Sequence, residues 1–254
     1  MAINWREKFL AFGIHFLATA ALGACAAALI FLVWFPSPFA TMIGGTELFI
    51  LVVGCDLALG PLLSLVVYDS RKSRGKLVFD YTVIAIAQLG AMIYGVYIVA
   101  GTRPVYVGFS GDRYEIVTAR DIDEDELVAA RLPEYRSLPW NGPRYVNVVI
   151  SRADHDDAMF TALAGKEEQV RPKFYQPFDT ALESIHRHAR SVAELEKKFP
   201  AYAPALDAAV GAEHLTPEGA RWLPVRHRNG FWTALVDPAN GRPLRYVAVD
   251  PYGD

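Results

Sequence analysis

Two polar side chains interrupt long apolar stretches of the chain, and their chemistry can be defined from their surroundings. Asp56 stands within the apolar stretch 48–68, and Gln88 stands within the stretch 77–99. If both stretches cross a membrane, the two residues lie at matching depths, since helical residues rise by about 1.5 Å each. A carboxylate at mid-bilayer costs about 2.5–3.5 kcal/mol on insertion scales. We therefore expect Asp56 to face other helices and to find a hydrogen-bonding partner there.

This pair of residues supports two interpretations. In the first, Asp56 and Gln88 form a structural hydrogen bond between the second and third apolar helices. In the second, Asp56, Gln88 and the neighbouring Pro61 form a candidate intramembrane site for a membrane-embedded partner or an ion. Pro61 removes one backbone hydrogen bond from its helix and, following Gly60, predicts a kink. The sequence leaves both interpretations open.

Other residues capable of catalysis or metal binding are scattered along the chain. The run Asp154-His155-Asp156-Asp157 contains metal-ligating residue types, but acidic residues at the start of a helix more often complement its dipole. His186 and His188 are two positions apart on a predicted helix and so point in different directions. The sequence contains no glycine-rich phosphate loop, nucleophile elbow or zinc-ligand spacing. We predict no catalytic residue, no metal ion and no cofactor.

Three apolar stretches in the first 102 residues have the length of membrane spans. They cover residues 9–35, 48–68 and 77–99, and the first of them is apolar apart from His15 and Thr19. About 20 apolar residues cross a bilayer, and a helix of a soluble core does not stay apolar on all sides for so long. Only five of the 28 acidic residues and six of the 25 basic residues lie in this region. The chain is therefore predicted to be an integral membrane protein that contacts the lipid bilayer.

The basic residues near the spans predict their orientation. Arg6 and Lys8 precede the first span, and the segment 71–76 between the second and third spans carries four basic residues. The segment 37–47 between the first two spans carries none. Short basic segments face the cytoplasm. The N-terminus is therefore expected in the cytoplasm, and the C-terminal domain is expected on the other side of the membrane.

The two cysteines lie within the predicted spans. Cys25 and Cys55 therefore cannot form a disulfide in the C-terminal domain, even in an oxidising compartment. The segment Leu22-Gly23-Ala24-Cys25 has the form of a lipoprotein cleavage site. A mature lipoprotein turns polar directly after its cysteine, however, whereas this chain stays apolar up to residue 35. A membrane span is the expected structure.

From Pro104 onward the pattern changes to short strands and amphipathic helices. Strands are predicted at 104–110, 113–119, 144–150, 221–226, 231–236 and 244–249, the first two joined by a turn at Gly111-Asp112. Helices are predicted after Asp121, at 154–164 and at 180–199. The fold class is therefore three transmembrane α-helices in a domain of residues 1–102, followed by an α+β domain of residues 103–254 with a mainly antiparallel sheet.

The sequence around the second and third spans also resembles a known family. The matching residues are Asp56-Leu-Ala-Leu-Gly-Pro-Leu-Leu, the basic loop, Phe79-Asp80, Gln88-Leu-Gly-Ala and Arg103-Pro104-Val105-Tyr106. As a set they are similar to the TfpX/TfpZ family of type IV pilin accessory proteins, most clearly over residues 48–109. The resemblance implies an inner-membrane protein of a Gram-negative bacterium with a periplasmic C-terminal domain. It implies a non-enzymatic chaperone or assembly factor that binds a cognate type IV pilin, and other pilus assembly components, and promotes pilus assembly.

Two rival functions follow from the residues alone. An enzyme that modifies pilin or envelope precursors would need reactive side chains that converge on a pocket. A small membrane sensor or transport component would be centred on Asp56, although three spans are few for transport and no inverted repeat is present. Nucleic acid is not an expected partner, because no stripe of lysine and arginine is present to bind phosphates.

Overall fold

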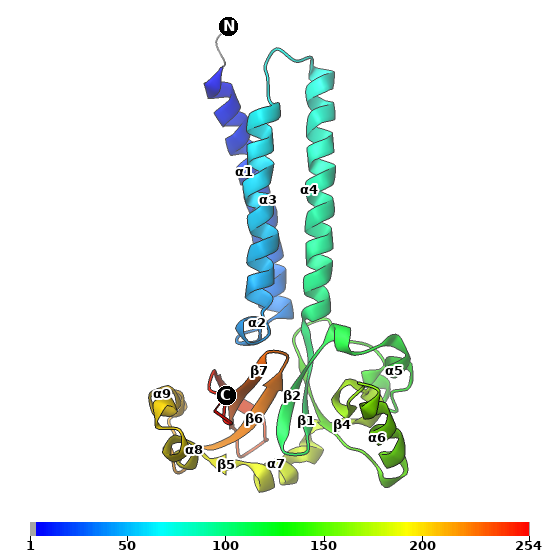
Figure 1. The fold of residues 1–254 in the computed structure, drawn as a ribbon, viewed down its shortest axis with the longest axis vertical. Coiled ribbons are helices and arrows are strands. Elements are labelled where there is room, and N and C mark those ends of the chain that lie inside the picture. The colour runs from blue at the N-terminus through cyan, green and yellow to red at the C-terminus, as the bar shows by residue number, and fades with distance from the viewer. Residues whose placement is uncertain (1–3, 254) are drawn as a thin grey trace. The chain divides into compact units, whose positions relative to one another are not determined.

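The computed structural model describes residues 4–253, which form two compact units that divide between Thr102 and Arg103 (Figure 1). The first unit is built of long helices. The second unit is built on a β-sheet.

Within the described residues, three helices are long and apolar enough to cross a membrane. The first is α1 (Trp5–Ala28), which continues as the π-helical segment η1 (Leu29–Trp34). The second and third are α3 (Gly45–Val67) and α4 (Arg74–Thr102), and a short helix α2 (Phe39–Met42) lies between the first and second. The predicted apolar stretches lie within these helices except for one residue each at Phe35 and Tyr68, so the prediction of three membrane-spanning helices is confirmed.

Helix α3 is the centre of this unit, because α1 and α4 each pack chiefly against it. Two glycines permit close contact between the helices. A Cβ atom on Gly23 of α1 would lie 2.8 Å from Val53 of α3, and one on Gly95 of α4 would lie 2.4 Å from Val52. Most of the remaining surface of the helices is apolar and exposed, as expected of a surface that faces lipid.

The second unit contains a sheet with the strand order β4-β3-β1-β2-β6-β7-β8, and β5 pairs with the start of β6. The strands are β1 (Pro104–Ser110), β2 (Arg113–Thr118), β3 (Arg144–Val148), β4 (Tyr175–Pro177), β5 (Arg190–Ser191), β6 (Arg221–His227), β7 (Gly230–Val236) and β8 (Pro243–Val247).

Most neighbouring strands are antiparallel. The predicted hairpin of β1 and β2 turns at Gly111, whose φ of 64° favours glycine. Strands β6, β7 and β8 form the predicted C-terminal meander. Within the described residues, the pairings β1–β3 and β2–β6 are parallel, and the other pairings are antiparallel. The prediction of a mainly antiparallel sheet in an α+β domain is confirmed.

Short helices pack on the sheet and enclose two groups of buried side chains. The helices are α5 (Glu124–Val128), α6 (His155–Leu163), α7 (Leu182–His188), α8 (Val192–Lys198) and α9 (Ala203–Ala212). One group joins α5 and α6 to β1, β2 and β3 around Tyr106 and Tyr175. The other joins α8 and α9 to β6, β7 and β8 around Trp222 and Leu206. Both groups lie within residues 103–254.

The prediction of one helix at 180–199 is wrong. The chain leaves the helical conformation at Ala189, whose ψ is 129°, and forms β5 before α8 begins. Strand β5 pairs with Arg221 and Trp222 of β6, and the Trp222 indole N–H donates a hydrogen bond to the carbonyl of Ser191 at 3.1 Å. Pairing with a strand that lies far away in the sequence therefore overrides the helical periodicity.

Candidate intramembrane site

A chain of hydrogen bonds joins the three long helices within the membrane unit. On α1, the His15 ring lies with Nδ1 2.6 Å from the Ser64 hydroxyl of α3. Its Nε2 lies 2.7 Å from the side-chain oxygen of Gln88 on α4. The Gln88 amide nitrogen donates at 3.4 Å to the main-chain carbonyl of Asp56, again on α3. His15 is thus the residue through which all three helices are connected.

The geometry fixes the direction of each bond in this chain. Because the Gln88 amide nitrogen faces a carbonyl, its oxygen faces the His15 ring and accepts from Nε2–H. In the neutral imidazole, Nδ1 then accepts from the Ser64 hydroxyl. Thr19 adds a bond within α1 by donating to the His15 carbonyl at 3.0 Å. Both ring nitrogens of His15 therefore have a hydrogen-bonding partner on a neighbouring helix.

The carboxylate of Asp56 is not part of this chain. The residue is 8% exposed, yet its carboxylate has no hydrogen bond or ion pair to any residue in the range 4–253. It lines a pocket of about 190 Å³ between α1 and α4, together with mostly apolar side chains. The other lining residues are His15, Ala18, Thr19, Leu22, Ala85, Gln88, Leu89 and Met92. An acceptor without a partner thus lies in an apolar pocket inside the membrane unit.

The structure brings two of the three predicted site residues together. Asp56 and Gln88 line the same pocket, whereas Pro61 is buried within α3 and does not line it. The expected bond between the side chains of Asp56 and Gln88 is not the one observed, because the Gln88 oxygen is taken by His15. The roles of His15 and Ser64 were not predicted from the sequence, although both residues interrupt apolar stretches and could have been found by that signal.

Gly60, which precedes Pro61 in α3, contacts the Gln88 side chain at this site. A Cβ atom there would lie 2.0 Å from the Gln88 amide nitrogen. A side chain at this position would therefore push Gln88 out of the gap between α3 and α4. Glycine is required here to admit the amide, and the amide completes the chain of hydrogen bonds.

The basic segments of the membrane unit meet at the end of α3. Lys8, near the start of α1, donates to the Leu65 carbonyl at 2.9 Å, and Lys72 donates to the Val67 carbonyl at 2.8 Å. Lys72 also pairs with Asp80 at 2.7 Å. Cations are favoured at a helix C-terminus, where carbonyls lack helical partners. The N-terminal basic residues and the basic loop thus occupy the same end of the unit.

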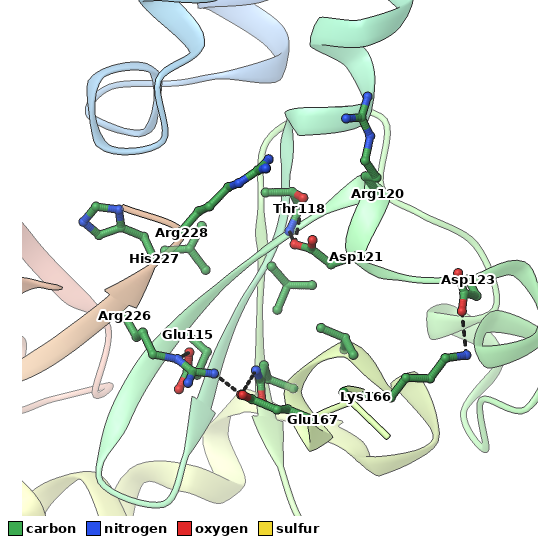
Figure 2. Close-up of a pocket in the computed structure, with 15 residues that line it drawn as sticks. Glu115, Thr118, Arg120, Asp121, Asp123, Lys166, Glu167, Arg226, His227 and Arg228 are labelled. Carbon is green, nitrogen blue, oxygen red and sulfur yellow. Dashed lines mark hydrogen bonds and ion pairs between the residues drawn. The ribbon is translucent and has the colours of Figure 1, made fainter. Parts of the chain in front are cut away.

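The C-terminal domain has a cavity of its own, of about 640 Å³, shown in Figure 2. Arg226 lies between Glu115 and Glu167 and forms an ion pair with each. Glu115 also pairs with Arg113 at 2.7 Å, so each of its oxygens has a guanidinium partner. Burial raises the pKa of the Glu115 carboxyl against the opposing effect of these two arginines. A carboxylate held on both oxygens is not free to act as a general base.

The remaining polar residues of this cavity are arranged around its edge. Lys166 pairs with Asp123 at 2.5 Å, and Asp121 accepts from the Thr118 main chain and hydroxyl. Figure 2 shows the His227 ring turned away from Arg226 and Glu115. The carboxylates that line this cavity are therefore engaged by neighbouring donors within the domain.

The acidic run that suggested a metal is engaged in ion pairs. Asp154 pairs with Arg131 at 2.7 Å, and Asp157 pairs with Arg171 at 2.9 Å and with Lys173. These cations lower the pKa of the Asp157 carboxyl, Lys173 most strongly. Within residues 4–253, no group of three histidine, cysteine or acidic residues is close enough to hold a metal ion.

Comparison with known proteins places this architecture in a family. The profile of the fimbrial assembly protein FimB family matches residues 3–44. A fimbrial assembly protein of serogroup I from Dichelobacter nodosus is 33% identical over 229 residues, which cover 89% of this chain and 89% of that protein. The serogroup E1 protein of the same organism is 32% identical over 229 residues, with the same coverage. The protein of serogroups C1 and C2 is 40% identical over 118 residues, or 46% of this chain and 90% of that protein.

No solved structure is significantly similar to the chain. The matches nonetheless extend over both the membrane unit and the C-terminal domain. They bear out the resemblance to type IV pilin accessory proteins, and with it a role in the biogenesis of fimbriae. The chain therefore belongs to the fimbrial assembly protein family.

Proposed function

We propose that this protein is a non-enzymatic chaperone or assembly factor of the bacterial inner membrane, which binds a cognate type IV pilin and promotes pilus assembly. Membership of the fimbrial assembly protein family supports the general role. The finer proposal concerns how the pilin is held. It depends on one observation, the pocket between α1 and α4.

This pocket suits a foreign transmembrane helix. Because α1 and α4 both pack chiefly on α3, a groove remains between them whose floor includes Asp56. The side chains of Ala18 and Ala85 are small, so the backbone of another helix can approach the groove closely. The lining is mostly apolar and lies within the span, where an apolar helix can be received without exposing its backbone.

The C-terminal domain supports a binding role in preference to catalysis. Its cavity contains Glu115, the buried carboxylate best placed to react, but both oxygens are engaged by arginines. A catalytic base would need a free oxygen directed at a substrate. We therefore favour an assembly factor over an enzyme that modifies pilin.

The arrangement of lysines supports a cytoplasmic N-terminus and a periplasmic C-terminal domain. Lys8 and Lys72 cap the same end of α3, which brings the basic N-terminus and the basic loop together. Both are expected on the cytoplasmic side. A phosphatase fused after Gly253 should be active and one fused after Lys72 inactive; the reverse pattern would contradict this orientation.

The direct test of the assembly role is a deletion strain. Loss of the gene should reduce surface pili while the pilin is still made. A plasmid copy should restore them, and a copy with Ala85→Phe, which fills the groove, should not. Ile86→Phe is the matched control, because Ile86 is the next residue on α4 and is 68% exposed. Full piliation of the deletion strain, or equal complementation by both variants at equal protein levels, would contradict the proposal.

A further inference from the structure

The unpartnered carboxylate of Asp56 defines what the groove recognises. Asp56 stands at the middle of α3, about 16 Å from either end at 1.5 Å per residue. It is more than nine-tenths buried and lines the pocket between α1 and α4. Buried polar groups in proteins nearly always have a hydrogen-bond partner, and the need for a partner is greater within a bilayer. The carboxylate therefore lacks a hydrogen-bond donor, and the groove has room to admit one.

The neighbouring polar groups do not supply this partner. Both ring nitrogens of His15 are engaged, by Ser64 and by Gln88. The Gln88 nitrogen is directed at the main-chain carbonyl of Asp56, at 3.4 Å. The Thr19 hydroxyl donates within its own helix. These bonds hold the three helices in place and leave the carboxylate facing the pocket.

We propose that Asp56 is the acceptor that selects a partner transmembrane helix carrying a hydrogen-bond donor at mid-span. The inference rests on the proposed function, because the occupant to which it commits is the transmembrane helix of the pilin. A helix is the fitting occupant, since Leu22, Leu89 and Met92 offer an apolar wall and a spanning segment must satisfy its own backbone. An N–H donor at the depth of Asp56 would satisfy the carboxylate, and a donor near either end of the span would not reach it.

The test uses purified full-length protein in lipid vesicles and synthetic transmembrane helices as probes. Each probe is a polyleucine helix of about 20 residues. One carries a lysine at its centre, one carries the lysine two turns from the centre, and one carries none. Binding is measured by energy transfer between dyes on probe and protein. The central-lysine helix should bind about threefold to twentyfold more tightly than the others, the range that interhelical hydrogen bonds in membranes provide.

Variants test whether this preference depends on the Asp56 carboxylate. Asp56→Leu should remove the preference and leave the binding of the polyleucine helix unchanged. Asp56→Asn keeps an acceptor oxygen but not the charge, so it should retain at most a part of the preference. Val83→Leu, on the lipid-facing side of α4, should behave as the unaltered protein does. A circular dichroism spectrum of each variant shows whether the helices remain folded.

The outcomes separate this inference from the assembly role. Equal binding of all three probes, or a preference that survives in a folded Asp56→Leu protein, would overturn the inference. Energy transfer between two copies of this chain that disappears in Asp56→Leu would also overturn it, because the groove would then receive a second copy. Selection of the central-lysine helix together with full piliation of the deletion strain would leave the inference standing and refute the assembly role.

Discussion

Three polar side chains inside the membrane unit, those of His15, Ser64 and Gln88, join one helix to another. His15 contacts Ser64 of α3 and Gln88 of α4, and Gln88 returns to the backbone of α3. The sequence identified Asp56 and Gln88 as partners by their depth alone. Depth could not show which side chain faces which, because that depends on the rotation of each helix about its axis. Helix α1 supplies the observed partner of the Gln88 side-chain oxygen, His15.

Replacing His15 should therefore weaken the membrane unit. His15→Leu leaves the Ser64 hydroxyl and the Gln88 oxygen without partners inside a bilayer. The free energy of unfolding should fall by about 1–3 kcal/mol. Unfolding of the full-length protein from mixed micelles, followed by circular dichroism during titration with a denaturing detergent, measures this change. Leu17→Ala, at a position that is 68% exposed, should have a much smaller effect. Equal stability of His15→Leu and the unaltered protein would refute the assigned role.

We expect His227 to make the stability of the C-terminal domain depend on pH. Burial lowers the pKa of its imidazole below the usual 6.5. The unfolded chain then binds a proton at a higher pH than the folded domain does, so stability falls as the pH falls through about 6.5 toward the folded pKa.

This effect can be measured by denaturant unfolding of residues 103–254 at about pH 7.5 and pH 5.5. His227→Gln cannot gain the proton, so it should lose less stability between the two values than the unaltered domain does. His155→Gln, at an exposed histidine, should retain the full loss. A loss that is the same in all three proteins would show that His227 is not responsible.

At the level of helices and strands, local signals predicted much of the fold. The three spans follow from apolar length, and the hairpin β1–β2 and the meander β6–β8 follow from alternation and glycine turns. The interruption of the predicted helix before α8 could not be predicted from local signals, because β5 forms by pairing with β6. Helix α9 was also missed, although Leu206 and Val210, four positions apart, are a helical signal. The groove at Asp56 depends on how the helices pack, which no local pattern records.

Glycine contacts provide a test of helix packing. Gly95→Ala places a Cβ atom 2.4 Å from Val52, so α3 and α4 must shift apart. Overpacking of this kind costs about 1–3 kcal/mol. Gly90→Ala, on the same helix, meets nothing within 4 Å and should be neutral or slightly stabilising. Detergent unfolding of the two variants should therefore separate them, and similar stability for both would contradict the close packing of α3 and α4 at Gly95.

At the scale of the whole molecule, the chain combines a membrane unit and a sheet domain with its own buried side chains. The two groups of buried residues in the domain are built entirely from residues beyond Arg103. We therefore expect residues 103–254 to fold when expressed without the helices. The isolated segment should show a single cooperative thermal transition. A broad, non-cooperative transition would mean that the membrane unit or a partner is needed to complete the domain.

We propose that a pilin helix occupies the groove between α1 and α4. Photo-crosslinking in living cells that express the cognate pilin, with benzoylphenylalanine placed at single positions of α4, can detect this contact. Met92 lines the groove, whereas Val83 is 51% exposed and lies half a turn away around the helix. If the pilin helix lies in the groove, benzoylphenylalanine at Met92 should crosslink to pilin and benzoylphenylalanine at Val83 should not. Pilin captured equally from both positions, or from Val83 alone, would contradict it.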